Sequence, residues 1–219
     1  MRIIELKETI TASNDRDAEV LRGELKQKGT LLVNLMASPG AGKTTLLERT
    51  IRDLKDRMRI AVMEADVDSD VDAVRIEQTG AKAVQAHTDG MCHMDAGMTR
   101  RALDALGDET FDLVVLENVG NLICPAEFDT GAGRCVMLLS VPEGDDKPLK
   151  YPLMFTKSDV LIITKTDVAP YFDFDLDACI ERARNLNPDI TVFTVSAKTG
   201  DGFEEWENWL IKAVADWKN

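Results

Sequence analysis

From residue 30 onward the chain alternates short apolar runs with stretches of helical periodicity, and this alternation restricts the possible folds to few classes. The predicted strands are 31–37, 60–65, 83–86, 113–116, 136–141, 160–164 and 192–195. The predicted helices are 44–55, 71–78, 94–106, 176–185 and 203–214. Strands joined by helices pair in parallel, and the helices then cover both faces of the sheet. We therefore expect an α/β fold with a mostly parallel β-sheet, in which ligands bind beyond the carboxyl ends of the strands.

An extra amphipathic helix is predicted before the first strand. It covers residues 14–28, with Asn14 and Asp15 as its N-terminal cap. A chain of 219 residues is long enough for one α/β domain with a substantial core and a little too short for two. We therefore divide the chain into an N-terminal helical extension, residues 1–29, and one domain, residues 30–219.

The composition narrows the partners and the compartment. With 26 basic and 39 acidic residues the net charge is -13, which argues against a nucleic-acid partner because phosphates demand clustered Lys and Arg. No apolar stretch is long enough to span a bilayer, and the first residues do not resemble a signal peptide. Four cysteines are too few for a disulfide scaffold. We expect a cytoplasmic protein without a membrane partner, in which an important cysteine serves as a ligand or nucleophile.

The loop after the first predicted strand has the features of a phosphate-binding loop. It reads Ala37-Ser38-Pro39-Gly40-Ala41-Gly42-Lys43-Thr44-Thr45. Its glycines let successive backbone N–H groups face a β-phosphate, and the following helix adds the positive end of its dipole. We expect Lys43 to bridge the β- and γ-phosphates and the Thr44 hydroxyl to ligate Mg²⁺. The domain is therefore predicted to be a P-loop NTPase fold, with nucleotide-binding residues Gly40, Ala41, Gly42, Lys43, Thr44 and Thr45.

Two later loops favour GTP over ATP. Thr164-Lys165-Thr166-Asp167 follows one predicted strand, and Ser196-Ala197-Lys198 follows the last. The Asp167 carboxylate can accept both the N1 and the N2 hydrogens of guanine, a contact that adenine cannot make. The Lys165 stem can lie over the base, and a backbone N–H of the second loop can reach guanine O6. We predict a guanine site at Lys165, Asp167, Ser196, Ala197 and Lys198, with affinity loosened somewhat by Thr164, where guanine-binding proteins usually have Asn.

Acidic residues at two strand ends indicate a magnesium site. Asp66 follows the second predicted strand, and Glu117 follows the fourth. We expect both to ligate Mg²⁺ together with Thr44, and we expect Asp72 to position the attacking water. Gly120, three residues past Glu117, is spaced to sense the γ-phosphate. The predicted catalytic residues are Lys43, Asp66, Asp72 and Glu117, with slow intrinsic GTP hydrolysis because positioning is most of what the protein contributes. The other acidic residues of segment 66–72 are interpreted as capping groups at the start of a helix.

A second set of side chains suits a softer metal. Cys92 and His93 are adjacent in the loop after the third predicted strand, and Cys124, which Pro125 stiffens, lies four residues past Gly120. In a parallel sheet both loops emerge at the nucleotide-binding edge. Thiolates and imidazoles suit Zn²⁺, Ni²⁺ or copper, and the sequence does not choose among them. Three ligands are one short of a closed tetrahedral site, so water or a second chain must complete it. A symmetric dimer would bring four thiolates and two imidazoles together.

The remaining soft ligands are interpreted differently. Cys135 flanks a predicted strand and Cys179 lies on a helix face, and we expect both to be packing residues. His87 has no thiol beside it and is interpreted as a polar group at a strand end.

Over residues 30–215 the chain resembles the HypB family, the GTPases that assist nickel insertion during NiFe-hydrogenase maturation. The resemblance is carried by segments 38–45, 88–96, 117–129 and 143–146, of which the second and third together are highly specific. The related urease-maturation GTPases have a Cys-Pro-His triplet where this chain has Cys92-His93, and they lack a thiol that matches Cys124.

The resemblance implies GTP or GDP, Mg²⁺, and Ni²⁺ or Zn²⁺ as cofactors. It also implies a homodimer promoted by GTP or metal, with Cys92, His93 and Cys124 at its interface and with Lys147 or Lys150 reaching the nucleotide across the dimer. The N-terminal helix would dock a HypA-type metallochaperone, and the client would be the hydrogenase large-subunit precursor. The sequence contains neither the N-terminal Cys-x-x-Cys-Gly-Cys motif nor the His-rich stretch of many bacterial members, so storage of several nickel ions is not expected.

Three other functions remain open at this point. One is a related metal-insertion chaperone of the urease type, and another is a metal-binding protein whose nucleotide turnover has decayed. Intact Lys43, Thr44, Asp66 and Glu117 speak against decay. The third is a GTPase whose metal is structural Zn²⁺, which should resist chelators and unfold the protein when it is lost.

Overall fold

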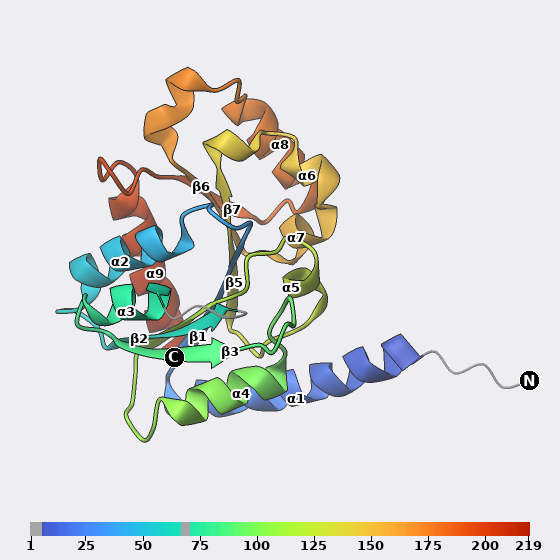
Figure 1. The fold of residues 1–219 in the computed structure, drawn as a ribbon, viewed down its shortest axis with the longest axis vertical. Helices are drawn as coiled ribbons and strands as arrows, with labels where there is room; N and C mark the ends of the chain where they lie inside the picture. The colour runs from blue at the N-terminus through green and yellow to red at the C-terminus, as the bar shows by residue number, and fades with distance from the viewer. Residues whose placement is uncertain (1–5, 67–70) are drawn as a thin grey trace, which may run out of the picture.

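The computed structural model describes residues 6–66 and 71–219 of the chain, with side chains from residue 11 onward. Seven parallel strands form one sheet in the order β3-β2-β4-β1-β5-β6-β7 (Figure 1). Its strands are β1 (Leu31–Ala37), β2 (Ile60–Asp66), β3 (Lys82–His87), β4 (Leu113–Glu117), β5 (Arg134–Ser140), β6 (Val160–Thr164) and β7 (Thr191–Thr194). All seven residues of β1 are buried, as expected for a central strand covered on both faces. The predicted α/β class with a parallel sheet is confirmed.

Apart from α1, the long helices agree with the predicted ones to within a few residues. They are α1 (Leu6–Lys28), α2 (Lys43–Leu54), α3 (Val71–Glu77), α4 (Ala96–Ala105), α8 (Leu176–Leu186) and α9 (Phe203–Lys218). Sequence periodicity missed the short elements α5 (Cys124–Glu127), η1 (Val141–Glu143), α6 (Lys147–Lys150), α7 (Pro152–Lys157) and η2 (Thr166–Tyr171). Each of these covers too few helical turns for a 3.6-residue pattern to appear.

Helices cover both faces of the sheet, so the hydrophobic core consists of one layer on each face. On one face α2, α3 and α9 bury residues such as Leu46, Ile76 and Trp206 against β1, β2 and β4. On the other face α1 and α4 cover β2, β4 and β1. Beside them α5, α7 and α8 cover β5 and β6. The loops at the carboxyl ends of the strands remain free to build a site.

The N-terminal helix begins earlier than the sequence predicted. α1 starts at Leu6, so the predicted cap at Asn14 and Asp15 is wrong. Asn14 lies inside the helix, and its amide Nδ2 donates to the Asp129 carbonyl while its Oδ1 accepts from the Ala96 N–H, both at 2.9 Å. Tertiary contacts thus use the amide that local reasoning assigned to capping. α1 lies along α4 (Figure 1), and the division of the chain at residue 29 stays a prediction.

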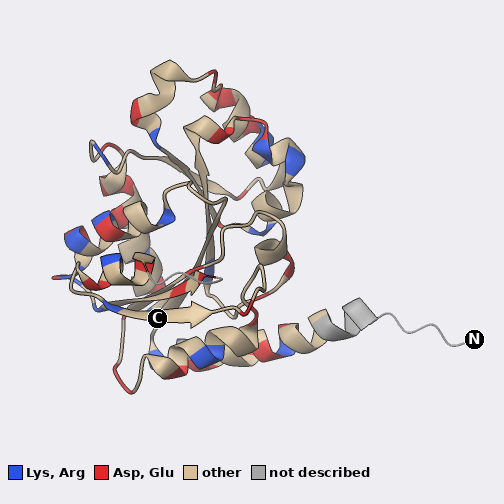
Figure 2. Cartoon of the chain, in the orientation of Figure 1, with Lys and Arg blue, Asp and Glu red and all other residues tan. Residues whose placement is uncertain are grey.

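Charged residues lie mainly on the covering helices and loops, where positive and negative positions alternate (Figure 2). Among the helices that the structure describes, none has the length and apolar character needed to cross a membrane.

Candidate nucleotide and metal site

The loop between β1 and α2 has the backbone conformation that a phosphate cradle requires. Gly40 and Gly42 have φ angles of +75° and +100°, a left-handed region that side chains with a Cβ rarely adopt. A Cβ on Gly40 would meet no atom within 4 Å, so open space adjoins the loop at this exposed point. Lys43 and Thr44 then open α2, whose N-terminus points its N–H groups at that space.

Two carboxyl groups stand beside this cradle. Glu117, at the end of β4, accepts a hydrogen bond from Thr44 Oγ1 at 2.9 Å and lies 3.9 Å from Lys43 Nζ. Glu64 is its register partner on β2, and both side chains are buried. Burial and the neighbouring Glu117 charge raise the pKa of Glu64 to about 11, and burial also raises the pKa of Glu117. The pair therefore retains a proton when no cation neutralises it.

The unmet polar atoms of this pair suit a hard cation. Without this shared proton, Glu64 Oε1 and Glu117 Oε2 are buried and have no hydrogen-bond donor in the part of the chain that the structure describes. Oxygen ligands of this kind, with the Thr44 hydroxyl beside them, are those that Mg²⁺ prefers. The sequence analysis predicts Asp66 as a Mg²⁺ ligand and does not predict Glu64. An acidic residue inside an otherwise apolar strand is nevertheless a sign of a functional carboxylate, because buried charges need a partner.

The pocket in front of the cradle has a volume of about 510 Å³. It is lined by Pro39, Gly40, Gly42, Lys43, Thr44, Thr45, Glu64, Ala65, Asp66, Asp72, Arg75, Glu117, Asn118, Val119, Gly120 and Lys165. Arg75 donates to Asp72 and to Glu48, each at 3.0 Å, so Asp72 reaches the pocket as part of an ion-pair cluster. The capping role that the sequence assigned to the acidic residues of segment 67–70 lies outside the described residues.

A second pocket of about 300 Å³ adjoins the first at the predicted guanine end. Its lining includes Lys165, Asp167, Ala197 and Lys198. The buried Ser196 hydroxyl donates to Asp167 Oδ1 at 2.8 Å and so fixes the carboxylate. All five residues of the predicted guanine site are therefore brought together.

Thr164 and Lys165 connect the guanine end to the phosphate loop. The Thr164 hydroxyl donates to the Ala41 carbonyl, and Lys165 Nζ donates to the Gly40 carbonyl, both at 2.7 Å. Lys165 has φ +60°, an uncommon angle for a residue with a side chain. The Thr at position 164 thus acts on the phosphate loop, which the sequence did not reveal.

The predicted γ-phosphate sensor lies directly against the phosphate loop. A Cβ on Gly120 would approach Pro39 Cγ to 2.9 Å and Pro39 N to 3.0 Å. Only glycine therefore lets the loop after β4 sit this close to the phosphate loop. The two loops are therefore in direct contact at Gly120 and Pro39.

The three predicted soft ligands converge at the same edge. Cys92, His93 and Cys124 each offer an atom, and these atoms lie within 4.8 Å of one another. Cys92 Sγ lies 2.7 Å from Cys124 Sγ and 3.9 Å from His93 Nδ1. Cys124 opens α5, with Pro125 in the first turn, so its predicted position in a loop is corrected to the start of a short helix. The donor set of two sulfurs and one nitrogen fits Ni²⁺ or Zn²⁺.

The surroundings of this cluster set its protonation and its access. His93 is buried and stacks on Phe128, with ring centroids 3.8 Å apart and an interplanar angle of 12°. Burial lowers the pKa of His93, which favours the neutral imidazole that binds metals. Contact with Cys92 raises the pKa of the Cys124 thiol. Cys92 is exposed, so the cluster opens to solvent on that side.

The other candidate side chains lie apart from the cluster. Cys179 is buried, Cys135 is half-buried, and His87 is exposed at the end of β3, as the sequence predicted for a strand-end group. Lys150 pairs with Asp146, and Lys147 lies over the Tyr151 ring 5.4 Å from its centroid. Neither lysine lines the nucleotide pocket of this chain.

A parallel sheet with a phosphate loop after β1, acidic residues at its carboxyl edge and a Lys-x-Asp base pocket defines a P-loop nucleotide-binding protein. The family model described as the CobW/HypB/UreG nucleotide-binding domain matches residues 31–194. The hydrogenase maturation factor HypB of Rhizobium leguminosarum bv. viciae is 46% identical, over 98% of this chain and 72% of that protein.

Two solved structures are similar in fold as well as in sequence. HypB from Helicobacter pylori in complex with nickel has a TM-score of 0.88 and 38% identity, covering 93% of this chain and 96% of that chain. The hydrogenase maturation factor HypB from Archaeoglobus fulgidus has a TM-score of 0.86 and 39% identity, covering 93% and 99%. The chain belongs to the HypB family within the CobW/HypB/UreG group.

Proposed function

We propose that this protein is a GTPase that couples GTP binding and slow hydrolysis to the binding and transfer of nickel, or zinc, during NiFe-hydrogenase maturation. The observation that carries the proposal is the placement of Cys92, His93 and Cys124 on the edge that holds the nucleotide pocket. One continuous segment, residues 117–124, runs from the predicted Mg²⁺ carboxylate to a metal thiol. The family membership and the nickel in the Helicobacter pylori structure support the same function.

The phosphate end is built to hold and neutralise a triphosphate. Backbone N–H groups at Gly40 to Gly42 and the N-terminus of α2 face the β-phosphate, and Lys43 spans the β- and γ-phosphates. Thr44, Asp66 and Glu117, with Glu64 beside them, would hold Mg²⁺, which supplies positive charge to the phosphate oxygens. Asp72 orients water towards the γ-phosphate. These residues position groups more than they react, so intrinsic turnover is slow.

The base pocket selects guanine. Ser196 holds Asp167 so that both carboxylate oxygens can accept hydrogens from one base edge. The Lys165 stem covers the base, and the backbone of Ala197 and Lys198 reaches O6. GTP and GDP are therefore the nucleotides of this site.

The metal is cargo that passes through an incomplete site. Cys92, His93 and Cys124 supply three ligands, and a second copy of the chain or a delivering protein supplies the rest. A GTP- or metal-promoted homodimer, a HypA-type metallochaperone docked on α1 and the hydrogenase large-subunit precursor as client follow from this proposal. These steps take place in the cytoplasm.

The test compares nickel affinity in two nucleotide states. The purified protein is titrated with Ni²⁺ and with Zn²⁺ while bound to GDP and to a non-hydrolysable GTP analogue. Coupling of the usual size changes the affinity roughly 5- to 150-fold, and GTP affinity must change by the same factor when metal binds. Equal metal affinities in both states would refute the coupled function.

A further inference from the structure

One buried residue of the nucleotide pocket, Asn118, also hydrogen-bonds the residue that follows the metal ligand His93. Asn118 directly follows Glu117, lines the nucleotide pocket and is 1% exposed. Its backbone N–H donates to the Leu35 carbonyl of β1 at 2.9 Å, which anchors it to the sheet. The residue therefore stands at a fixed point between the two regions.

The side chain of Asn118 contacts both of them. Its Oδ1 accepts from the Met94 N–H at 3.3 Å and from the Val119 N–H at 2.9 Å. Met94 is joined to His93, and Val119 is joined to Gly120. Its Nδ2 donates to Asn34 Oδ1 at 2.9 Å, which keeps the oxygen turned towards the two loops. One carbonyl oxygen thus holds the backbone beside a metal ligand and the backbone beside the γ-phosphate sensor.

The contact of Gly120 with Pro39 supplies the mechanical input. Because Gly120 has no room for a Cβ against Pro39, a γ-phosphate that shifts either loop also shifts Val119. The Val119 and Met94 amides share one acceptor, so a change in the first hydrogen bond alters the second.

We propose that Asn118 is the positioning residue that transmits nucleotide state to the metal ligands, through the Met94 N–H that precedes α4. This inference rests on the proposed coupling of GTP and metal. It assigns that coupling to a particular side chain, and it requires no contact between Asn118 and either ligand.

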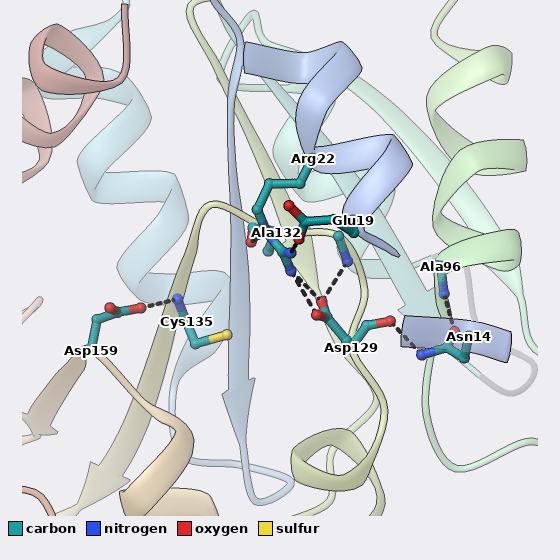
Figure 3. A network of polar contacts seen from close by, with 9 residues as sticks. Asn14, Glu19, Arg22, Ala96, Asp129, Ala132, Cys135 and Asp159 are labelled. Carbon is teal, nitrogen blue, oxygen red and sulfur yellow. Dashed lines mark hydrogen bonds and ion pairs between the residues drawn. The ribbon is translucent and has the colours of Figure 1, made fainter. Parts of the chain in front are cut away.

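The chain offers a matched control in a second buried amide. Asn14 of α1 links the Ala96 N–H, three residues past His93, to the Asp129 carbonyl, five residues past Cys124 (Figure 3). It does not line the nucleotide pocket. Loss of Asn14 should therefore weaken metal binding equally in both nucleotide states, whereas loss of Asn118 should remove the difference between them.

The experiment compares wild type, Asn118→Ala, Asn118→Asp and Asn14→Ala in two measurements. The first is hydrogen exchange at the Met94 amide in metal-free protein, with GDP and with a non-hydrolysable GTP analogue. The second is the ratio of Ni²⁺ affinities in these two states. Asn118→Asp is the rescue variant, because a carboxyl that stays protonated at this buried position keeps an acceptor for both amides and an O–H donor for Asn34 Oδ1. If Asn118→Ala does not fold, Asn118→Ser replaces it, because the serine side chain is too short for its hydroxyl to reach the Met94 N–H.

We expect the analogue to change Met94 exchange in wild type and in Asn14→Ala but not in Asn118→Ala. The affinity ratio should fall to about 1 in Asn118→Ala from a wild-type value of roughly 5 to 150 and should return in Asn118→Asp. An Asn118→Ala protein that keeps the wild-type ratio overturns the inference. So does a Met94 amide in wild type that does not respond to nucleotide. A wild-type affinity ratio of about 1 would refute the coupled function, and the inference would fail with it, whereas a wild-type ratio that persists in Asn118→Ala refutes the inference alone.

Discussion

The phosphate end of the nucleotide pocket and the Cys/His cluster lie on one edge of the sheet, but the protein holds them in different ways. Thr44, Glu64 and Glu117 are buried and come from a helix start, the inside of β2 and the end of β4. The cluster comes from a loop and a four-residue helix, and Cys92 is exposed. The first arrangement is buried at the floor of its pocket. The second is open and one ligand short, as sites that exchange a ligand are.

This difference determines which site can release its ligand. A nucleotide site must present the same geometry at every turnover, so its groups are fixed by the sheet. A delivery site must let a partner's ligand enter, so its groups lie on segments that can shift. We therefore expect each site to bind its own ligand independently, and we expect the two sites to influence each other only through the loop after β4.

Lys43→Ala tests the separation with the largest expected effect. Loss of the cation beside the phosphates should lower GTP hydrolysis roughly 100- to 1000-fold, the range for removing a group that stabilises transition-state charge. Nickel affinity without nucleotide should not change, because Lys43 is not one of the three soft ligands. Single-turnover phosphate release and a nickel titration measure both. Lys212→Ala, on the exposed side of α9, is the control. Weakened nickel binding in the nucleotide-free variant would contradict the separation.

His93→Ala and His87→Ala are a matched pair for the metal site. These are the two histidines of the chain, and both follow β3 or end it. Removal of His93 should weaken Ni²⁺ binding by more than the roughly 10- to 100-fold that supporting partners of metal ligands cost. Removal of His87 should have no effect. Competition with a metal-binding dye measures the affinities. An equal loss of nickel affinity in both variants would show that the nickel site is not the Cys/His cluster.

The two sites also differ in how far the sequence predicts them. The phosphate loop is a continuous segment whose spacing carries its chemistry, so the order of residues from Gly40 to Thr45 is enough to assign it. Cys92, His93 and Cys124 are distant in sequence, and parallel-strand topology was enough to predict that they meet. The predictions of the phosphate loop and of the Cys/His cluster both depend on where the strands end, and the end of an apolar run in the sequence shows this position well.

The sequence failed where tertiary contacts override local preference. Asn14 has the chemistry of a helix cap, and three-dimensional packing gives its amide to Asp129 and Ala96 instead. Glu64 was passed over because register between β2 and β4, which pairs it with Glu117, cannot be read from one strand. The sequence predicts only that Thr164 loosens guanine affinity because it replaces Asn. In the structure its hydroxyl donates a hydrogen bond to the Ala41 carbonyl of the phosphate loop.

Glu64→Gln tests the buried carboxyl pair. Since this pair retains a proton in the absence of a cation, the neutral amide should preserve the thermal stability of the nucleotide-free protein. It should weaken Mg²⁺ binding to the GTP-bound protein roughly tenfold or more, by analogy with other partners of metal ligands. Thermal unfolding and a Mg²⁺ titration of nucleotide affinity measure the two effects. Glu77→Gln, on the exposed side of α3, serves as the control. An unchanged Mg²⁺ requirement would remove Glu64 from the site.

Metal binding should depend on pH more steeply than nucleotide binding. Contact with Cys92 raises the pKa of Cys124, so this thiol is protonated near neutral pH and must lose its proton to bind metal. Burial lowers the pKa of His93, so its imidazole is already neutral there. Apparent nickel affinity should therefore rise with pH, by about tenfold per unit for each thiol proton displaced. Titrations from about pH 7 to about pH 8.5 measure the slope. A flat profile would mean that the thiols bind as thiolates already formed.

Phe128→Leu should have the smallest effect and probes how the open site is held. The ring stacks on His93, and stacked pairs contribute about 0.5–1.5 kcal/mol beyond the area they bury. Leucine keeps apolar contact but loses the stack, so nickel affinity should fall roughly 2- to 10-fold while GTP affinity stays constant. Phe172→Leu, at a partly exposed ring outside the cluster, controls for the substitution itself. If Phe128→Leu binds nickel as wild type does, the ring stack does not position the His93 imidazole. The backbone next to His93 then positions it, through the hydrogen bond from the Met94 N–H to Asn118. In that case a residue of the nucleotide pocket fixes this metal ligand more firmly than the neighbouring Phe128 ring does.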